Sequence, residues 1–291
     1  MKKIIFIIPF ILFATLLYGQ NKFKTLLWKV TSPESKNVSF LFGTFHEVSP
    51  SFFDSLTNVV FNLQQSDILF VEQSISAPKT QTITDLPVWT VEKWNKLLTN
   101  EQKQIFTEFV KKAEDSIYYT LNPLFLSLAT ARLYFDNFCK LDNPYSGLMD
   151  HHIEKLALKQ SKKIYSLDIN QVTLLKNVAE KFSFSQDSLY ASYTIQAMQS
   201  MLKEDLSGCE VLNDYMKFDM NYDLDLDLTQ NSSIYPLLID RNTMWTKTLH
   251  ESLPTNNCFI AVGFRHLFYK QGLIQQLRNL GYDVTPVQIE R

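Results

Sequence analysis

The stretch FLFGTFHEV, residues 40–48, sets the plan of this chain. It starts as an apolar run, ends that run at Gly43 and reaches His46 three residues later. The stretch FIAVGFRHL, residues 259–267, repeats this layout near the other end of the chain. Short apolar runs that stop at a glycine are typical of buried strands. The sequence therefore predicts two buried strands, each followed at the same offset by one of only five histidines.

The composition predicts a globular protein with a sizeable core. The chain has 291 residues, of which 45% are hydrophobic, a length that suits one large domain or two small ones. Its 7 glycines and 10 prolines exclude a fibrous or low-complexity protein. The formal net charge is −2 and no basic stripe runs along the sequence, so we expect no nucleic-acid partner.

The first nineteen residues have the form of a signal peptide. The positive start MKK precedes an apolar segment, residues 4–18, and Gly19 supplies a small residue for cleavage. This segment is short for a membrane span. We therefore predict a signal peptide over residues 1–19 and a single exported domain over residues 20–291, periplasmic or secreted. The alternative is an uncleaved anchor, which would be the only contact with a membrane.

Hydrophobic periodicity predicts strands near both ends of the chain and helices between them. The first two apolar runs flank the polar turn SPESK and so predict a hairpin. Apolar steps of three and four, as in residues 123–138, indicate helices. We predict an α/β fold with a mixed central β-sheet, flanking helices and a large helical insert or cap at about residues 85–250. Strands are expected within 24–31, 37–43, 66–73, 162–168 and twice in the tail 257–289, and a helix over 52–65.

The three cysteines have no zinc-finger spacing. Cys139 and Cys209 form a candidate disulfide between helical segments, since an exported protein permits such bonds. Cys258 lies inside an apolar run, where a cysteine is expected to pack as a small core residue.

Three functional side chains are predicted to meet at one edge of the sheet. Glu72 directly follows the apolar run DILFV, and His46 and His266 follow the two runs quoted above. If these strands are parallel neighbours, their carboxyl ends form the edge at which α/β proteins bind ligands. Two imidazoles and a carboxylate are the ligands of a two-histidine, one-carboxylate metal site. Gly43 and Gly263 would let the chain turn sharply there and approach the ligand closely. The alternative is that these histidines are satisfied structural residues.

The position of His266 predicts a neutral imidazole. It would lie in the first turn of a helix over residues 265–280. The positive end of a helix dipole disfavours the imidazolium, and a metal requires the neutral ring.

Arg241 is predicted to lie on a buried face. In a helix over residues 233–251 it follows Leu238 by three positions and precedes Trp245 by four, so all three side chains share one side. A buried cation is costly unless it is paired. Arg241 is therefore either an ion pair with a core carboxylate or a cation directed at the site, where it would hold a substrate carboxylate or a developing oxyanion. Asp168 ends another predicted strand and is a second carboxylate for this edge.

The sequence also resembles a known family over nearly the whole mature chain. The residues that carry the resemblance are Gly43-Thr44-Phe45-His46, Glu72, Arg241-Asn242, Val262-Gly263-Phe264-Arg265-His266, Gly272-Leu273 and the closing segment Gly281-Tyr282-Asp283-Val284-Thr285-Pro286-Val287. Their order is similar to that of the TraB/GumN family, which includes the TIKI metal-dependent proteases and is distantly similar to the erythromycin esterase and ChaN-like folds. Two positions depart from the family pattern: Asp168 is shorter than the glutamate common there, and Phe264-Arg265 is bulkier.

The resemblance implies an exported hydrolase of the peptidase class that uses Mn²⁺, Co²⁺ or Zn²⁺ and acts on a peptide or small molecule. A metal-activated water would attack the scissile carbonyl. The general base is either Glu72 or Asp168. The predicted metal ligands are His46, His266 and Glu72. The predicted catalytic residues are Glu72, Arg241 and Asp168, and the predicted substrate-binding residues are Asn242, Gly43, Gly263 and Arg265.

Two non-catalytic functions remain open from the sequence. The same scaffold with histidines and tyrosines beside an apolar groove would suit a protein that binds haem or a peptide without turnover. A vestigial site on an interaction module is the third possibility. The sequence makes no prediction of the oligomeric state.

Overall fold

The computed structural model describes residues 24–76, 88–139, 148–168, 170–228 and 235–291. The predicted signal peptide lies outside these residues. Among the residues described, no helix combines the length and apolar character that a membrane span requires.

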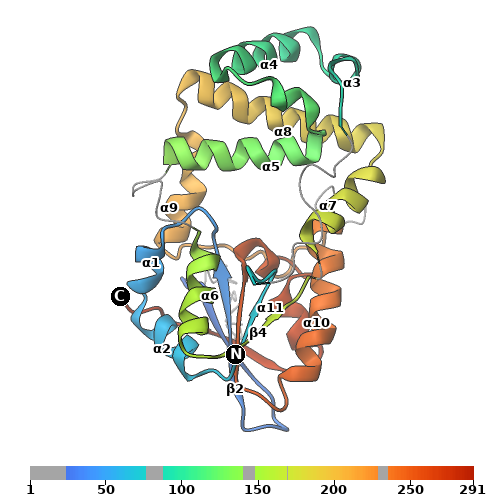
Figure 1. Ribbon diagram of the computed structural model, residues 1–291. Helices are drawn as coiled ribbons and strands as arrows, with labels where there is room; N and C mark the ends of the chain where they lie inside the picture. The colour runs from blue at the N-terminus through green and yellow to red at the C-terminus, as the bar shows by residue number, and fades with distance from the viewer. Residues whose placement is uncertain (1–23, 77–87, 140–147, 169, 229–234) are drawn as a thin grey trace, which may run out of the picture.

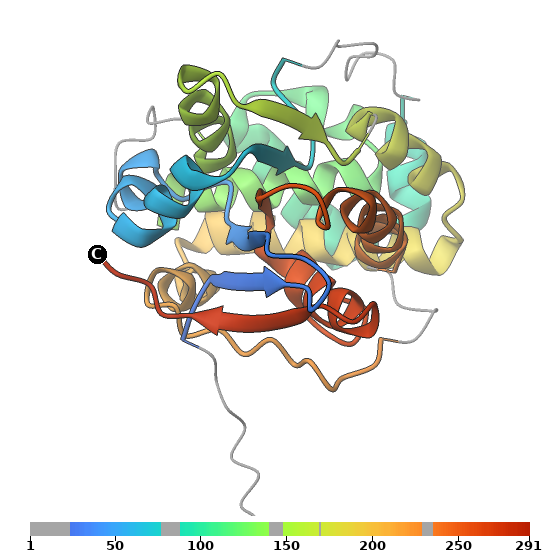
Figure 2. The same ribbon diagram turned by 90° about the horizontal axis from the view of Figure 1, so that it is seen from below.

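The core of the fold is a six-stranded mixed sheet with the strand order β4-β3-β5-β2-β1-β6. Strands β2, β5, β3 and β4 run parallel to one another, and β1 is antiparallel to both of its neighbours. Helices lie on both faces of the sheet, so the predicted α/β class is confirmed (Figures 1 and 2). The strands are β1 Leu27–Thr31, β2 Val38–Thr44, β3 Ile68–Val71, β4 Lys163–Ser166, β5 Cys258–Gly263 and β6 Asp283–Val287.

The predicted strands lie in the sheet where their burial and pairing were expected. All four residues of β3 are buried, as expected for a parallel strand covered on both faces. The predicted hairpin is confirmed, because β1 and β2 pair antiparallel from Leu27 opposite Phe42 to Thr31 opposite Val38.

Two sets of helices cover the two faces of the sheet. Helices α1, α2 and α6 lie on one face, and α10 and α11 lie on the other (Figures 1 and 2). A short 3₁₀ turn, η6, joins β5 to the segment before α11. These elements are α1 Pro50–Asp54, α2 Thr57–Gln65, α6 Met149–Lys159, α10 Arg241–Ser252, η6 Phe264–Leu267 and α11 Leu273–Asn279.

A separate helical layer lies beyond the arrowheads of the parallel strands (Figure 1). It consists of α3, α4, α5 and α8, and α5 packs along α8. Within the range predicted for the insert, α6 and β4 belong to the sheet layer. The remaining elements are α3 Val91–Leu97, α4 Asn100–Ala113, η2 Ser116–Thr120, α5 Pro123–Tyr134, η3 Phe135–Cys139, α7 Gln171–Glu180, α8 Phe184–Lys203, η4 Ser207–Cys209, α9 Glu210–Met216 and η5 Tyr235–Asp240.

The single helix predicted over residues 52–65 is wrong. The structure has two helices, α1 and α2, with a break at Ser55 and Leu56. The Ser55 hydroxyl donates to the carbonyl of Phe52, and Leu56 leaves the helical conformation with its side chain fully buried. Burial of Leu56 in the core therefore outweighs the hydrogen bonds that a continuous helix would have kept.

The structure contains the candidate disulfide between Cys139 and Cys209, which joins η3 to η4 across 70 residues of sequence. Cys258 is buried and free, as predicted. Because the bond closes a long loop, we expect the Cys139→Ser/Cys209→Ser double variant to lose about 2–5 kcal/mol of unfolding free energy. Urea unfolding of both proteins under oxidising conditions measures this loss. The Cys258→Ser variant is the control for thiol removal, and an unchanged midpoint in the double variant would contradict the expectation.

Candidate functional site

Four parallel strands end at the edge of the sheet that faces the helical layer. Since β2, β5 and β3 are parallel neighbours, the prediction that their carboxyl ends share one edge is confirmed. A cavity of about 600 Å³ opens at this edge. Its polar side includes His46, Glu72, Arg241, Arg265 and His266. Its lining also includes six leucines from the helical elements and the residues beside them, Leu128, Leu148, Leu174, Leu175, Leu237 and Leu238.

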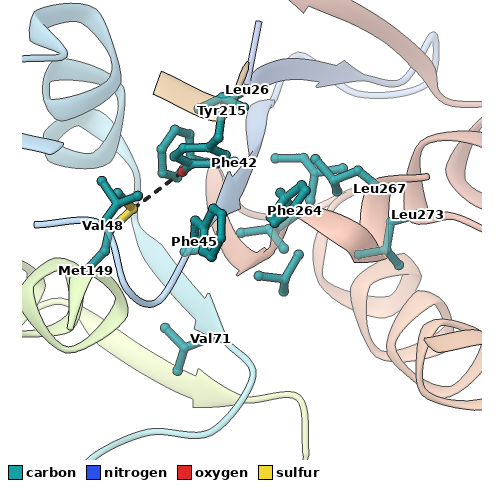
Figure 3. Close-up of a cluster of buried hydrophobic side chains, with 14 of the residues drawn as sticks. Leu26, Phe42, Phe45, Val48, Val71, Met149, Tyr215, Phe264, Leu267 and Leu273 are labelled. Atoms are coloured by element: carbon teal, nitrogen blue, oxygen red, sulfur yellow. Dashed lines mark hydrogen bonds between the residues drawn. The ribbon is translucent and has the colours of Figure 1, made fainter. Parts of the chain in front are cut away.

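An aromatic cluster beneath this cavity holds the two glycine-to-histidine segments together. The rings of Phe45 and Phe264, one from each segment, lie 5.1 Å apart between centroids. The ring of Tyr215 packs against both, and its hydroxyl donates to the carbonyl of Gly43 at 2.8 Å. Figure 3 shows Tyr215 with Phe45, Phe264 and Met149. Tyr215 also contacts the sulfur of Met149, at the start of α6. The two turns are therefore positioned by a shared hydrophobic core and not only by their own strands.

The two glycines are explained by close packing and not by a backbone conformation that only glycine adopts. Neither has a positive φ. A Cβ on Gly43 would lie 3.0 Å from both Cα and Cβ of Phe264. A Cβ on Gly263 would lie 3.0 Å from Oε1 of Glu72, which accepts a hydrogen bond from the Gly263 N–H at 2.8 Å. Each glycine thus makes room for another part of the site.

This packing predicts that Gly263→Ala displaces Glu72. The added methyl group would lie 3.0 Å from the carboxylate oxygen, closer than an ordinary contact, and Glu72 is too well buried to move without losing hydrogen bonds. We expect a loss of about 1–3 kcal/mol in unfolding free energy, the usual cost of overpacking. Thermal and urea unfolding measure it. The wild type serves as the reference, because Gly281→Ala would add strain at a residue with φ +88°. An unaltered unfolding midpoint in Gly263→Ala would contradict the expectation.

Arg241 lies between two buried carboxylates. Its Nη2 donates to Oε2 of Glu72 at 2.5 Å and to Oδ2 of Asp168 at 2.6 Å. Its guanidinium also lies over the ring of Trp245, 4.5 Å from the centroid, and the Trp245 indole N–H donates to Oδ1 of Asp168 at 2.8 Å. The predicted ion pair of Arg241 with a core carboxylate is therefore present. Arg241 also lines the cavity, as expected for a cation directed at the site, so the two explanations do not exclude each other.

These contacts determine the ionisation of Glu72. Burial by itself would raise the pKa of its carboxyl, but the guanidinium of Arg241, with further help from His266 and His46, outweighs burial and holds the pKa far below its ordinary range. The amide of Gln171 adds a hydrogen bond to Oε2 at 3.1 Å. Glu72 is therefore a carboxylate at neutral pH.

His266 is buried and neutral, but not for the predicted reason. The helix predicted over residues 265–280 is wrong: His266 lies in η6, and α11 begins only at Leu273. Burial, the largest cause, lowers the pKa of His266 to about 3. The Nδ2 of Asn242 donates to the carbonyls of His266 and Gln271, so the Oδ1 of Asn242 is the atom that faces the ring. The Nδ1–H of His266 therefore donates to this Oδ1 at 2.6 Å. Nε2 therefore carries the lone pair, which accepts from Nη1 of Arg241 at 3.1 Å.

His46 has a partner that the sequence did not predict. Asp150, in the first turn of α6, accepts through Oδ2 from Nδ1 of His46 and through Oδ1 from the hydroxyl of Thr44 at 2.6 Å. The charge of Asp150 is the largest cause that raises the pKa of His46, to about 10, against the opposing effect of burial. The side chain of His46 is 48% exposed because it faces the cavity.

Not every predicted substrate-binding residue lines the cavity. Gly263 and Arg265 do line it. Gly43 and Asn242 lie behind the wall, where they pack against η6 and hold His266. Asp168 is likewise buried behind Arg241. These three residues support the site and are not placed to contact a ligand in the cavity.

A comparison with protein families agrees with this geometry. A model of the TraB/PrgY/gumN family matches residues 26–286, nearly the whole chain. The chain belongs to the TraB/PrgY/gumN family. The resemblance to this family predicted from the two G-x-x-H segments, Glu72 and Arg241 is therefore confirmed. No curated protein and no solved structure matches the sequence.

In this TraB/PrgY/gumN protein the chemical types of the side chains suit a metal ion, but their spatial arrangement does not. Both histidines are held through Nδ1, by Asp150 and Asn242, as metal-ligating histidines generally are. Their Nε2 atoms are the remaining ligand atoms, but that of His46 must first lose a proton, because Asp150 raises the pKa of His46 to about 10. However, within the described part of the chain no three or more histidine, cysteine, aspartate or glutamate side chains are grouped to hold one ion. Arg241 takes the space between the acidic groups and His266.

Proposed function

We propose that this protein is an exported, divalent-metal-dependent hydrolase of the peptidase class. One observation carries the proposal. His46, Glu72, Arg241 and His266, which are far apart in the sequence, line one cavity of about 600 Å³ at the carboxyl edge of a parallel sheet. A cavity of this size, with an apolar wall and a few convergent polar groups, is typical of small-molecule and peptide sites.

The apolar wall of the cavity supports the choice of substrate. Leucines from the helical elements line the same cavity as the polar groups at the edge of the sheet. A peptide or small molecule could place an aliphatic group against these leucines and its scissile carbonyl at the polar edge. Burial of such a group contributes about 25 cal/mol per Å² of apolar surface.

The residues of the chain orient the ligand atoms and supply charge. His46, held at Nδ1 by Asp150, presents Nε2 to the cavity as a ligand atom for the metal. Asp150 orients the ring, as the carboxylate does in other carboxylate–histidine pairs. Arg241 holds Glu72 as a carboxylate and places positive charge near the reacting carbonyl.

Glu72, His266 and His46 are the residues that would hold the metal. A bound divalent ion lowers the pKa of its water and polarises a carbonyl. The neutral ring of His266, with Nδ1 held by Asn242, already has the state that a ligand requires.

Metal analysis of the purified mature protein tests this function. We expect about one Mn²⁺, Co²⁺ or Zn²⁺ per chain, and loss of that metal in both His46→Ala and His266→Ala. His152→Ala is the matched control, because His152 lies on the same helix as Asp150 but pairs with Asp54, at 2.7 Å. Unchanged metal content in the two site variants would refute the metal site.

Hydrolysis is measured separately with a library of peptides. We expect cleavage by the wild type and none by His46→Ala. A Soret band after haem titration, together with no cleavage across the library, would favour the haem-binding alternative instead. That result would leave the fold and the family unchanged, but it would exclude the hydrolase.

A further inference from the structure

The Cys139–Cys209 disulfide joins two segments that each place an aromatic ring against Phe45. Cys139 is the last residue of η3, and Phe135 is the first. Cys209 is the last residue of η4, and α9, which carries Tyr215, follows it directly. The bond therefore links the elements that supply the rings of Phe135 and Tyr215.

Phe45 contacts both of these rings and is followed directly by His46. The rings of Phe135 and Tyr215 each lie 5.4 Å from the ring of Phe45, in the edge-to-face arrangement that aromatic pairs favour. The Tyr215 hydroxyl also holds the carbonyl of Gly43, at 2.8 Å. These contacts fix the chain on both sides of Phe45 and so place His46 in the wall of the cavity.

We propose that the Cys139–Cys209 disulfide positions residues 43–48, here called the His46 segment, and that a dithiol reductant loosens this part of the site. The bond would act through the two aromatic rings and not by contact with His46. The inference goes beyond the proposed hydrolysis, because it concerns what holds the site in place and needs neither a substrate nor a metal ion.

The contacts that accompany the bond are weaker than the bond itself. The Tyr134 hydroxyl donates to the carbonyl of Asp205, just before η4, at 2.5 Å and lies 3.8 Å from the sulfur of Cys209. A Cβ on Gly208 would lie 2.9 Å from the ring of Tyr134, so η4 packs closely on that ring. A neutral hydrogen bond and a ring contact stabilise this junction less than a covalent bond between residues 70 apart. Loss of the bond is therefore expected to loosen η3 from η4.

Reduction of the bond is ordinary thiol–disulfide exchange. Cys139 is buried and Cys209 is half-buried, so the sulfur of Cys209 is the more accessible of the two. One thiolate of the dithiol forms a mixed disulfide with a cysteine, and its second thiol then displaces that cysteine. The protein gains two electrons and two protons as two thiols, and the dithiol is oxidised to a cyclic disulfide. Cys258 is buried in β5 and takes no part.

Reduction is expected to open the His46 segment without unfolding the sheet. Cys139 and Cys209 lie outside the strands, and β2 keeps its pairing with β1 and β5 up to Thr44. Beyond Thr44 the chain turns, and the N–H of Val48 donates to the carbonyl of Phe45 at 2.9 Å. When the two ring contacts loosen, this turn opens more often, and the amide hydrogen of Val48 exchanges faster with solvent.

Hydrogen exchange of the Val48 amide, followed by NMR, tests the proposal. The oxidised wild type is compared with Cys139→Ser/Cys209→Ser, and we expect about tenfold faster exchange in the variant. The matched control is the wild type in enough urea to lower its unfolding free energy by the same amount, because loss of the bond also lowers global stability. Exchange no faster in the variant than in this control would overturn the positioning role.

A second comparison leaves both cysteines in place and serves if the double variant does not fold. The Cys258→Ser protein is measured before and after reduction with dithiothreitol, so that no third thiol is present. We expect the same increase of about tenfold at Val48, reversed on reoxidation, with the amides of β3 and β5 unchanged. Global unfolding on reduction, with all of these amides exchanging alike, would overturn the inference.

A conservative variant of the two rings tests the route of the effect. Phe135→Leu/Tyr215→Phe, in the oxidised Cys258→Ser protein, should by itself speed exchange at Val48, because it weakens both contacts with Phe45. Reduction of this variant should then add little, since the bond acts through the same contacts. A further increase of about tenfold on reduction would show another route and would overturn the inference. These measurements use no substrate and no metal ion, so failure of the proposed function would not alter their outcome.

Discussion

Glu72→Gln is expected to lower the unfolding free energy by about 3–5 kcal/mol and to abolish hydrolysis. The carboxylate accepts from the Gly263 N–H, from Arg241 and from Gln171, and it is almost fully buried. A glutamine of the same shape must point its amide group toward one of these donors. The substitution also leaves the guanidinium of Arg241 with one carboxylate, Asp168, in place of two.

Urea unfolding of the purified variant measures the loss, and Glu154→Gln is the matched control. Glu154 is equally buried, but its carboxylate accepts from neutral groups, the Ser74 hydroxyl and the Ile75 N–H. Its substitution is expected to cost about 1.5–3 kcal/mol, the usual cost of a hydrogen bond to a charged group. Equal losses in the two variants would show that the ion pair with Arg241 contributes nothing specific.

Acidification from about pH 6.5 to pH 4 is expected to cost the folded state about 3 kcal/mol through His266 alone. Its pKa in the folded protein is about 3, chiefly because of burial, whereas an unfolded histidine titrates near 6.5. Between these values the unfolded chain binds a proton that the folded chain does not. Stability therefore falls as the pH falls, by about 1.4 kcal/mol per pH unit.

The measurement is urea unfolding across this pH range for the wild type and for His266→Gln. The variant should lose much of the pH slope, whatever its stability at neutral pH. Equal slopes in the two proteins would contradict the assignment of a buried, neutral His266.

His46 acts in the opposite direction. Because Asp150 raises its pKa to about 10, its contribution to stability is present below about pH 6.5 and is lost as the pH rises toward 10. The exposure of His46 to the cavity reduces that contribution. The two histidines of the repeated segments therefore differ in charge at neutral pH, although their sequence contexts look alike.

Local sequence features predicted the strands and the edge at which they end. The apolar runs before Gly43, Glu72 and Gly263 can be buried on both faces only as central parallel strands, and they are. Burial of Arg241 followed from its spacing to Trp245 on one helix face, and the structure agrees. The single helix predicted over residues 233–251 is wrong, because Leu238 is half-buried in the π-helical segment η5, before α10 begins. Such features depend on a few neighbouring residues, so they can be found without the fold.

Contacts over long sequence separations could not be predicted in the same way. Asp150 lies 104 residues from His46, and nothing in the sequence around either residue points to the other. The break at Leu56 and the interruption between His266 and Leu273 depend on what the buried side chains meet in the core. In each case tertiary packing outweighed local helix preference.

By itself, the sequence determined the α/β class and brought His46, Glu72 and His266 to one edge, because strand burial and strand direction follow from local hydrophobic patterns. Only the tertiary structure decided the state of each group: His266 neutral, His46 charged beside Asp150, and Arg241 between Glu72 and Asp168. The physical reason is that ionisation depends on burial and on charges within a few ångströms, and those neighbours come from distant parts of the chain.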